Sequence, residues 1–207
     1  MTIFRIDTAF DKEHDEFLYR PLCLRKGFDD FAVDDQLRPY LKAGDRDGYR
    51  QHWIPMPCFP CRGGTGGEKS IVLGDVVSTL FGCGAAFSDK AVALLTPYVK
   101  WCCEFHPLDV TGTNRHYFIL TEFCESEHLV DHDRTVVNEF RNRFSLVFVC
   151  AEQDVPSFFM LGISMFVKDD LWNEIVASGI TGLQATEVEA IFPDSPGAAA
   201  GPSPAAG

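Results

Sequence analysis

Long hydrophobic runs are missing from this chain. A transmembrane helix needs about 20 consecutive apolar residues, and polar or charged residues interrupt every hydrophobic segment well before that length. The opening residues 1–7, MTIFRID, also lack the basic start and apolar core of a secretory signal peptide. The sequence therefore predicts a cytoplasmic protein that has no membrane partner.

Basic residues are scarce. The 207 residues include 18 Lys and Arg against 30 Asp and Glu, for a formal net charge of −12. Nucleic acids and anionic membranes bind cationic surfaces, so this charge disfavours both and favours a basic partner. The acidity is concentrated, because residues 104–192 hold 15 acidic against 5 basic residues and the remainder holds 15 against 13.

The cysteine pattern of a small disulfide scaffold is also lacking. The 8 Cys are irregularly spaced over 207 residues, and Cys102 directly precedes Cys103. With no signal peptide, we expect a reducing compartment in which most thiols stay free and buried Cys acts as a small hydrophobe. Hydrophobic residues make up 46% of the chain and include 18 Phe, which is ample for a packed core and argues against disorder.

One Cys-x-x-Cys motif is present, at residues 58–61. A redox pair needs a helix that begins at the first Cys, whereas the Gly-rich segment 62–67 follows here. A zinc site needs a second pair of ligands, and the chain has no other Cys-x-x-Cys. A structural role is favoured, and a zinc or thiol site on Cys58 and Cys61 is the alternative.

Two further segments resemble catalytic or binding motifs only in part. Residues 63–70, GGTGGEKS, have Glu68 where a phosphate-binding loop requires Gly, so they are predicted to form a plain loop. His128 and His132 would share one face of a helix and could hold a metal, but Leu129 stands where the metalloprotease motif has Glu. The acids around these histidines favour a solvated edge.

Glu104 and His106 are a candidate acid–base pair, because alternate residues of a strand share a face. Pro107 indicates an edge strand, on which a surface pair is the simpler interpretation. No Gly-x-Ser-x-Gly hydrolase motif occurs. The sequence therefore predicts a protein that is not an enzyme and needs no cofactor.

The chain is predicted to hold an α+β domain, with a mostly antiparallel or mixed sheet and helices packed on one face. Helices are predicted at 88–97 and 169–178, with strands near 3–6, 99–110, 117–121, 144–151, 158–163 and 183–191. The strands at 144–151 and 158–163 are candidates for a hairpin. Pro and Gly punctuate residues 53–69 and predict a loop.

Three regions follow from this organisation. Residues 1–69 form an N-terminal extension or lobe, residues 70–192 form the α+β domain, and residues 193–207 form a disordered tail rich in Pro, Ala and Gly.

The most informative segment is residues 156–188, which predict a strand, a helix, a turn and a second strand. Asp169 and Asp170 suit the positive end of a helix dipole. Gly179 suits the left-handed residue that ends a helix. The turn Ile180-Thr181-Gly182-Leu183 then leads into a strand that alternates like a half-buried one.

This layout resembles the C-terminal end of a family of immunity proteins from bacterial polymorphic toxin systems. The matching residues there are Phe166-Val167, Leu171, Ile175, Gly179-Ile180-Thr181-Gly182-Leu183 and Val188. A second matching block comprises Phe87-Ser88-Asp89-Lys90-Ala91, Leu95, residues 103–110, residues 116–120 and Val130-Asp131. The resemblance covers roughly residues 70–192.

The resemblance implies a cytoplasmic protein that binds and neutralises a cognate bacterial toxin by occluding or locking it. An acidic protein suits a toxin with a basic surface. From charge density alone, we predict a contact edge that consists of Glu122, Glu125, Glu127, Asp131 and Asp133. A structural subunit of a larger assembly is a further alternative.

Overall fold

The structure is a computed structural model that describes residues 1–11, 16–17, 19–28, 30–61, 72–79, 84–123, 126–138 and 143–193. It divides the chain into two compact units. Unit 1 comprises Met1–Ile6, Glu125–Asn173 and Ala185–Gly207, and unit 2 comprises Asp7–Cys124 and Glu174–Gln184. Each unit is described by itself.

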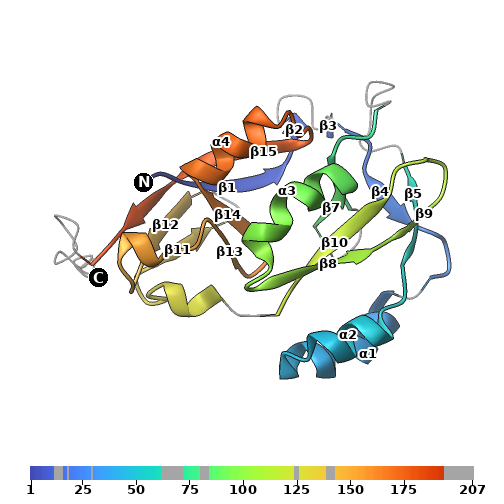
Figure 1. The fold of residues 1–207 in the computed structure, drawn as a ribbon, viewed down its shortest axis with the longest axis horizontal. Coiled ribbons are helices and arrows are strands. Elements are labelled where there is room, and N and C mark those ends of the chain that lie inside the picture. Colours follow the sequence, from blue (N-terminus) through green and yellow to red (C-terminus); the bar gives the residue numbers. More distant parts are fainter. Residues whose placement is uncertain are drawn as a thin grey trace, which may run out of the picture. The chain divides into compact units, whose positions relative to one another are not determined.

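Unit 1 is built on a six-stranded sheet (Figure 1). In sheet order its strands are β11 (Val136–Asn138), β12 (Arg143–Val147), β15 (Leu183–Ile191), β1 (Ile3–Thr8), β14 (Ser164–Lys168) and β13 (Phe158–Leu161). β12 and β15 are parallel, whereas β1 and β13 both pair antiparallel with β14. Two short 3-10 helices, η1 (Ser126–Leu129) and η3 (Glu152–Asp154), belong to this unit.

The hairpin predicted between residues 144–151 and 158–163 is wrong. β13 turns back at Gly162, which has φ of 59°, and pairs with β14, so that Leu161 lies opposite Ser164. Glycine tolerates this left-handed conformation, which a two-residue hairpin turn requires. β12 pairs instead with β11 and β15.

Aromatic side chains form the core of unit 1. The rings of Phe159 and Phe166 stack with centroids 5.2 Å apart, and both side chains are fully buried. Phe148 contacts Phe159 edge-on and stacks on Phe192 at 4.8 Å. Such offset and edge-on arrangements are favoured by the ring quadrupoles and add to the hydrophobic burial.

Unit 2 contains three smaller sheets. The largest is antiparallel, in the order β6 (Val76–Ser78), β7 (Ala85–Ser88), β10 (Tyr117–Glu122) and β8 (Cys103–Pro107). A second has the order β4 (Leu22–Leu24), β5 (Pro57–Pro60) and β9 (Asp109–Val110), and β2 (Phe10–Asp11) pairs with β3 (Glu16–Phe17).

Strand β5 corrects the prediction that residues 53–69 form a loop. Pro57 and Pro60 occupy the two ends of the strand, where a missing N–H costs least. Cys58 and Phe59 between them lie opposite Leu24 and Cys23 of β4. The rest of that segment from residue 62, including GGTGGEKS, lies outside the described residues.

Four α-helices occur in the described residues: α1 (Asp30–Ala43), α2 (Arg46–His52), α3 (Asp89–Val99) and α4 (Asp169–Ala177). Ser88 caps α3 by accepting a hydrogen bond from the Ala91 N–H, as the serine cap predicts. α3 buries Ala91, Leu95 and Val99 on one face of the large sheet of unit 2. α1 and α2 lie side by side (Figure 1).

The predicted α+β class is confirmed, with sheets dominating the cores. The boundary predicted at residue 69 or 70 falls among residues outside the described part, and β5 from before it pairs with β9 from after it. Residues 194–207 of the predicted tail also lie outside the description. Within the described residues, no helix has the length and apolarity to span a membrane.

Candidate functional site

The predicted acidic edge is divided between the two units. Glu122 ends β10 in unit 2, whereas Asp131 and Asp133 lie in a turn of unit 1. Asp131 holds that turn, because its Oδ1 accepts a hydrogen bond from the Asp133 N–H at 3.1 Å. Asp133 is exposed. Glu125 lies outside the described residues, and so does the side chain of Glu127.

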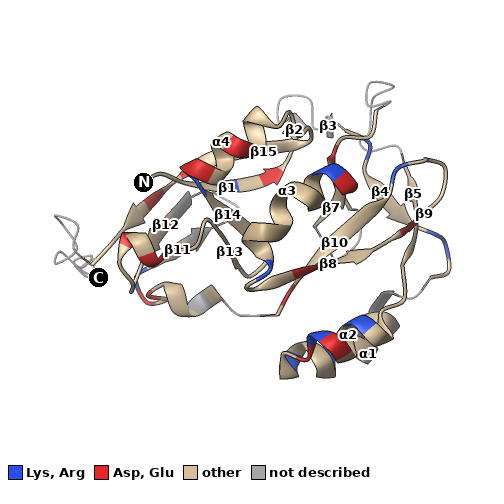
Figure 2. Cartoon of the chain, viewed as in Figure 1, with Lys and Arg blue, Asp and Glu red and all other residues tan. Residues whose placement is uncertain are grey.

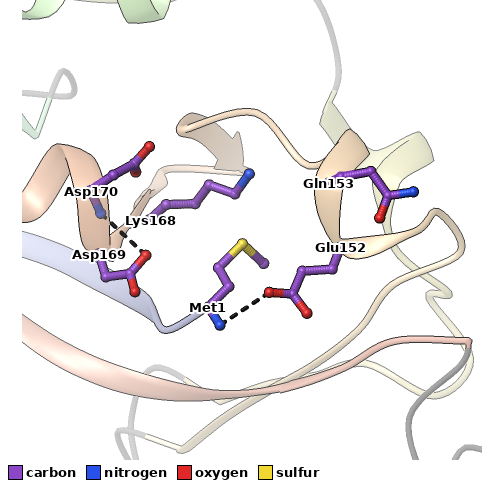
Figure 3. Close-up of a pocket in the computed structure, with 6 residues that line it drawn as sticks. All are labelled: Met1, Glu152, Gln153, Lys168, Asp169 and Asp170. Carbon is purple, nitrogen blue, oxygen red and sulfur yellow. Dashed lines mark hydrogen bonds and ion pairs between the residues drawn. The ribbon is translucent and has the colours of Figure 1, made fainter.

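Another set of acidic residues lines a pocket of about 390 Å³ on unit 1 (Figure 3). Glu152 and Gln153 come from η3, Lys168 ends β14, and Asp169 and Asp170 begin α4; Met1 completes the lining. The sequence separates η3 from α4 by the whole β13–β14 hairpin. Antiparallel pairing returns the chain to the same end of the sheet, which brings the three carboxylates together.

Local contacts fix the direction of these side chains. The Met1 ammonium pairs with Glu152 at 3.0 Å, and this hydrogen bond raises the pKa of the terminal amine. Lys168 donates its Nζ–H to the Val155 carbonyl. Asp170 accepts from the Ser157 hydroxyl and the Leu171 N–H, while Asp169 accepts from the Asp170 N–H. Backbone and hydroxyl donors thus hold both aspartates in place, and the Met1 ammonium also interacts electrostatically with Asp169.

Unit 1 is more acidic for its size than unit 2. It holds 12 acidic against 5 basic residues, whereas unit 2 holds 18 against 13 over a longer stretch of chain. Figure 2 shows acidic segments at η3 and at the start of α4. Sequence reasoning assigned Asp169 and Asp170 only to the helix dipole and missed their proximity to Glu152.

The turn after α4, which carries the family resemblance, is packed against β6 in unit 2. Asp75 accepts hydrogen bonds from the Thr181 N–H and hydroxyl, both at 3.0 Å, and from the Ser88 hydroxyl. Burial alone would raise the pKa of Asp75, but the Thr181 hydrogen bonds and the nearby Lys90 ammonium outweigh it and lower that pKa. This turn therefore has a structural role.

Gly182 in the same turn has no room for a side chain. Its φ is 93°, and a Cβ there would lie 1.8 Å from the Val76 carbonyl oxygen. The Thr181 carbonyl accepts a hydrogen bond from the Val76 N–H, which explains why the backbones approach so closely. Gly179 has φ of 66°, which confirms the predicted left-handed residue at the end of the helix.

The Cys-x-x-Cys residues have separate environments. Cys61 forms a disulfide with Cys23, with the two Cα atoms 5.8 Å apart. Cys58 is 1% exposed, lies in the apolar core of unit 2 and donates its thiol to the Met56 carbonyl. Cys58 and Cys61 thus do not act together as one thiol or metal pair in this structure. The disulfide is an exception to the expected free thiols, whereas Cys58, Cys102, Cys103 and Cys150 remain thiols.

Glu104 and His106 lie on β8, which is an edge strand as predicted, but the predicted surface pair is wrong. His106 is only 2% exposed and lies among the rings of Tyr49, Trp53 and Phe123. Burial lowers the pKa of His106 to about 4, so its ring is neutral at pH 7. No local sequence pattern indicates that α2 covers this strand.

A second pocket, of about 360 Å³, lies beside β8 in unit 2. Its lining is Arg46, Arg50, Val92, Thr96, Val99, Lys100, Cys103, Glu104, Phe105 and Phe118. Arg50 pairs with Glu104 at 2.7 Å, and Arg46 donates to the Lys100 and Trp101 carbonyls just after α3. A cation at the end of a helix offsets the negative end of its dipole. These arginines therefore join α2 to α3 and β8.

The histidines His128 and His132 do not share a helix face. His128 lies in η1 and His132 lies in the following turn, and both are exposed. The metal arrangement considered for them required one continuous helix. No group of three or more His, Cys, Asp or Glu side chains is arranged to hold a metal within the described residues.

Comparison with known proteins gives no assignment: no protein-family model matches this chain, and no curated protein matches its sequence.

Proposed function

We propose that this chain is an immunity protein that binds a basic toxin through the acidic surface of unit 1 and neutralises it. The pocket formed by Glu152, Asp169 and Asp170 is the single observation that supports this proposal most directly. The resemblance of residues 70–192 supplies the class of partner, and the excess of acids in unit 1 supplies the sign of its charge.

The pocket suits a Lys or Arg side chain of the partner. A guanidinium or ammonium donates hydrogen bonds to carboxylates and forms shorter, stronger contacts than neutral donors make. Asp169 and Asp170 have their positions set by backbone and hydroxyl donors, so little side-chain entropy is lost on binding. The wider acidic surface would steer a basic partner toward the pocket and raise the association rate.

A growth assay tests the function. The toxin-like gene encoded beside this one is induced in a neutral bacterial host with and without this chain. We expect growth only when the chain is present, together with co-purification of the two proteins. Continued killing despite soluble expression of the chain would refute this pairing.

Charge reversal tests the surface. Glu152→Lys should slow association with the toxin by about tenfold at low salt and weaken its salt dependence. Asp154→Lys is the matched control, because Asp154 lies in the same 3-10 helix and is exposed but does not line the pocket. Equal effects of the two variants would show that only the overall charge matters.

Neutralising the start of α4 gives a second matched pair. Asp169→Asn in unit 1 and Asp89→Asn in unit 2 each remove the first acid of a helix. Both should cost similar stability through the helix dipole, about 0.5 kcal/mol. Only Asp169→Asn should weaken toxin binding, and binding unchanged in both variants would place the interface elsewhere.

A further inference from the structure

Cys102 and Cys103 are adjacent thiols whose sulfur atoms lie 3.3 Å apart. They follow α3 and begin β8, in the turn whose carbonyls at Lys100 and Trp101 accept hydrogen bonds from Arg46. Cys102 also donates its thiol to the Val99 carbonyl. The backbone around the pair is therefore held on both sides, which keeps the two sulfurs in contact.

The two residues differ in their position relative to the pocket beside β8. Both are buried, but Cys103 lines the pocket of about 360 Å³ beside β8, whereas Cys102 is not part of that lining. A small oxidant in the pocket would therefore contact Cys103 rather than Cys102. The hydrogen bond with Cys102 and burial raise the pKa of the Cys103 thiol, so little of it is thiolate at neutral pH.

We propose that Cys102 and Cys103 form an oxidative modification site, which hydrogen peroxide converts to a disulfide between neighbouring residues. The Cys103 thiolate attacks a peroxide oxygen: an S–O bond forms, the O–O bond breaks, and water leaves after protonation. The Cys102 sulfur then attacks the sulfenic sulfur of Cys103, so that an S–S bond forms and a second water leaves. In total, two thiols lose two electrons and two protons to one peroxide.

The chemistry predicts a slow first step and a fast second step. The scarcity of thiolate limits the first step, whose rate should rise with pH. The second step is intramolecular between sulfurs already in contact, so it should be faster than attack on Cys103 by a thiol from solution. The simpler alternative is a pair of inert core thiols that serve only as small hydrophobes.

The product should be easier to reduce than the Cys23–Cys61 disulfide. Adjacent Cα atoms are about 3.8 Å apart across a trans peptide, which is shorter than the usual range for disulfides. Cys23 and Cys61 lie at 5.8 Å, within that range. Strained disulfides have more oxidising potentials and are typically the reversible ones.

The chain offers a direct assay, because trypsin releases residues 101–115 between Lys100 and Arg115, and this peptide contains only Cys102 and Cys103. The full-length protein, with its Cys23–Cys61 disulfide intact and Cys102 and Cys103 as thiols, is treated with hydrogen peroxide, denatured and alkylated. We expect this peptide to lose both alkylation sites together, with the mass of two missing hydrogens. Mild reduction should restore both sites while the Cys23–Cys61 bond remains.

Variants separate the two steps. In Cys102→Ser the sulfenic acid on Cys103 has lost its partner, so a sulfenic-acid trap should label peptide 101–115 in this variant and not in the wild type. Cys150→Ser is the control and should leave the result unchanged. Should Cys102→Ser fail to fold, the wild-type peptide alone decides the matter.

Three results would overturn the proposal. One is a peptide that keeps both alkylation sites at every peroxide dose that leaves the protein folded. Another is conversion of Cys103 to sulfinic or sulfonic acid without loss of Cys102. The last is a cross-link from this peptide to residues 116–134, which contain Cys124.

Discussion

Each of the two units is stabilised internally by a different kind of contact. In unit 1 the rings of Phe148, Phe159 and Phe166, which contact one another edge-on and by stacking, fill the core of a six-stranded sheet. Unit 2 joins several small sheets and helices through directed links: a disulfide, the Asp75 hydrogen bonds to the turn after α4, and Arg46 at the end of α3. Small sheets bury little apolar surface each, so specific polar and covalent contacts take a larger share of the stability.

This comparison predicts different sensitivities. Unit 1 should tolerate polar changes on its surface, including those in the acidic pocket, because its core is apolar. Unit 2 should be sensitive at single positions where one contact joins two elements. Four changes in unit 2 test this expectation, and unit 1 supplies the control for the first.

Gly182→Ala should have the largest effect. A Cβ would lie 1.8 Å from the Val76 oxygen, and φ of 93° disfavours Ala, so we expect a loss of more than about 4 kcal/mol. Gly162→Ala in unit 1 also has a positive φ but open space, and should cost only about 1 kcal/mol. Denaturant unfolding measures both, and equal losses would contradict the close-packed turn.

Removing the Cys23–Cys61 disulfide should come next. The bond closes a loop with a sequence separation of 38, so the double variant with Ser at both positions should lose about 4 kcal/mol. Hydrogen exchange should show the loss at β4 and β5 of unit 2, with β13 and β14 of unit 1 still protected. Cys150→Ser is the control. An unfolding curve that does not move on reduction would argue against a bond that stabilises the native state.

Acidification should destabilise the protein through His106. Its folded pKa of about 4 lies below the ordinary value of 6.5, so protonation favours the unfolded chain. The stability it contributes is complete above about pH 6.5 and is lost as the pH falls to about 4, for a total of about 3 kcal/mol. His106→Phe should flatten the unfolding free energy over that range, whereas His132→Gln at an exposed position should not.

Asp75→Asn should have the smallest effect, about 1 kcal/mol at pH 7, because Asn keeps one acceptor for Thr181. The pKa of Asp75 is lowered on folding, so the wild-type advantage is present above its ordinary value of 3.8 and lost as the pH falls through the folded value. Unfolding curves from pH 7 to pH 2 should therefore converge. Asp109→Asn, at an exposed position, is the control, and a gap that persists in acid would exclude the charge as the cause.

Local patterns predicted the elements that depend on neighbouring residues. The strand at 183–191 occurs over the predicted residues, α4 begins at Asp169, and Ser88 caps α3. Caps, glycine turns and alternation act within a few residues, so one sequence displays them. The α+β class follows from the same patterns.

Predictions about partners across the sequence were less successful. The hairpin between residues 144–151 and 158–163 is replaced by β13 with β14, and β5 forms inside an expected loop. The acidic edge lies partly in each unit, while Glu152 joins Asp169 and Asp170 in a pocket that sequence reasoning missed. Charge density along the chain carries no information about which acids meet in space.

The sequence by itself determined the net charge, the positions of α3 and α4 and the glycine that ends α4, because these depend on composition and on contacts a few residues apart. Only the tertiary structure decided that Cys61 bonds to Cys23, that His106 is buried beneath α2, and that three distant carboxylates share one pocket. Those outcomes depend on which strands pair and which faces are covered. Contacts between residues far apart in the sequence determine both the strand pairing and the covered faces.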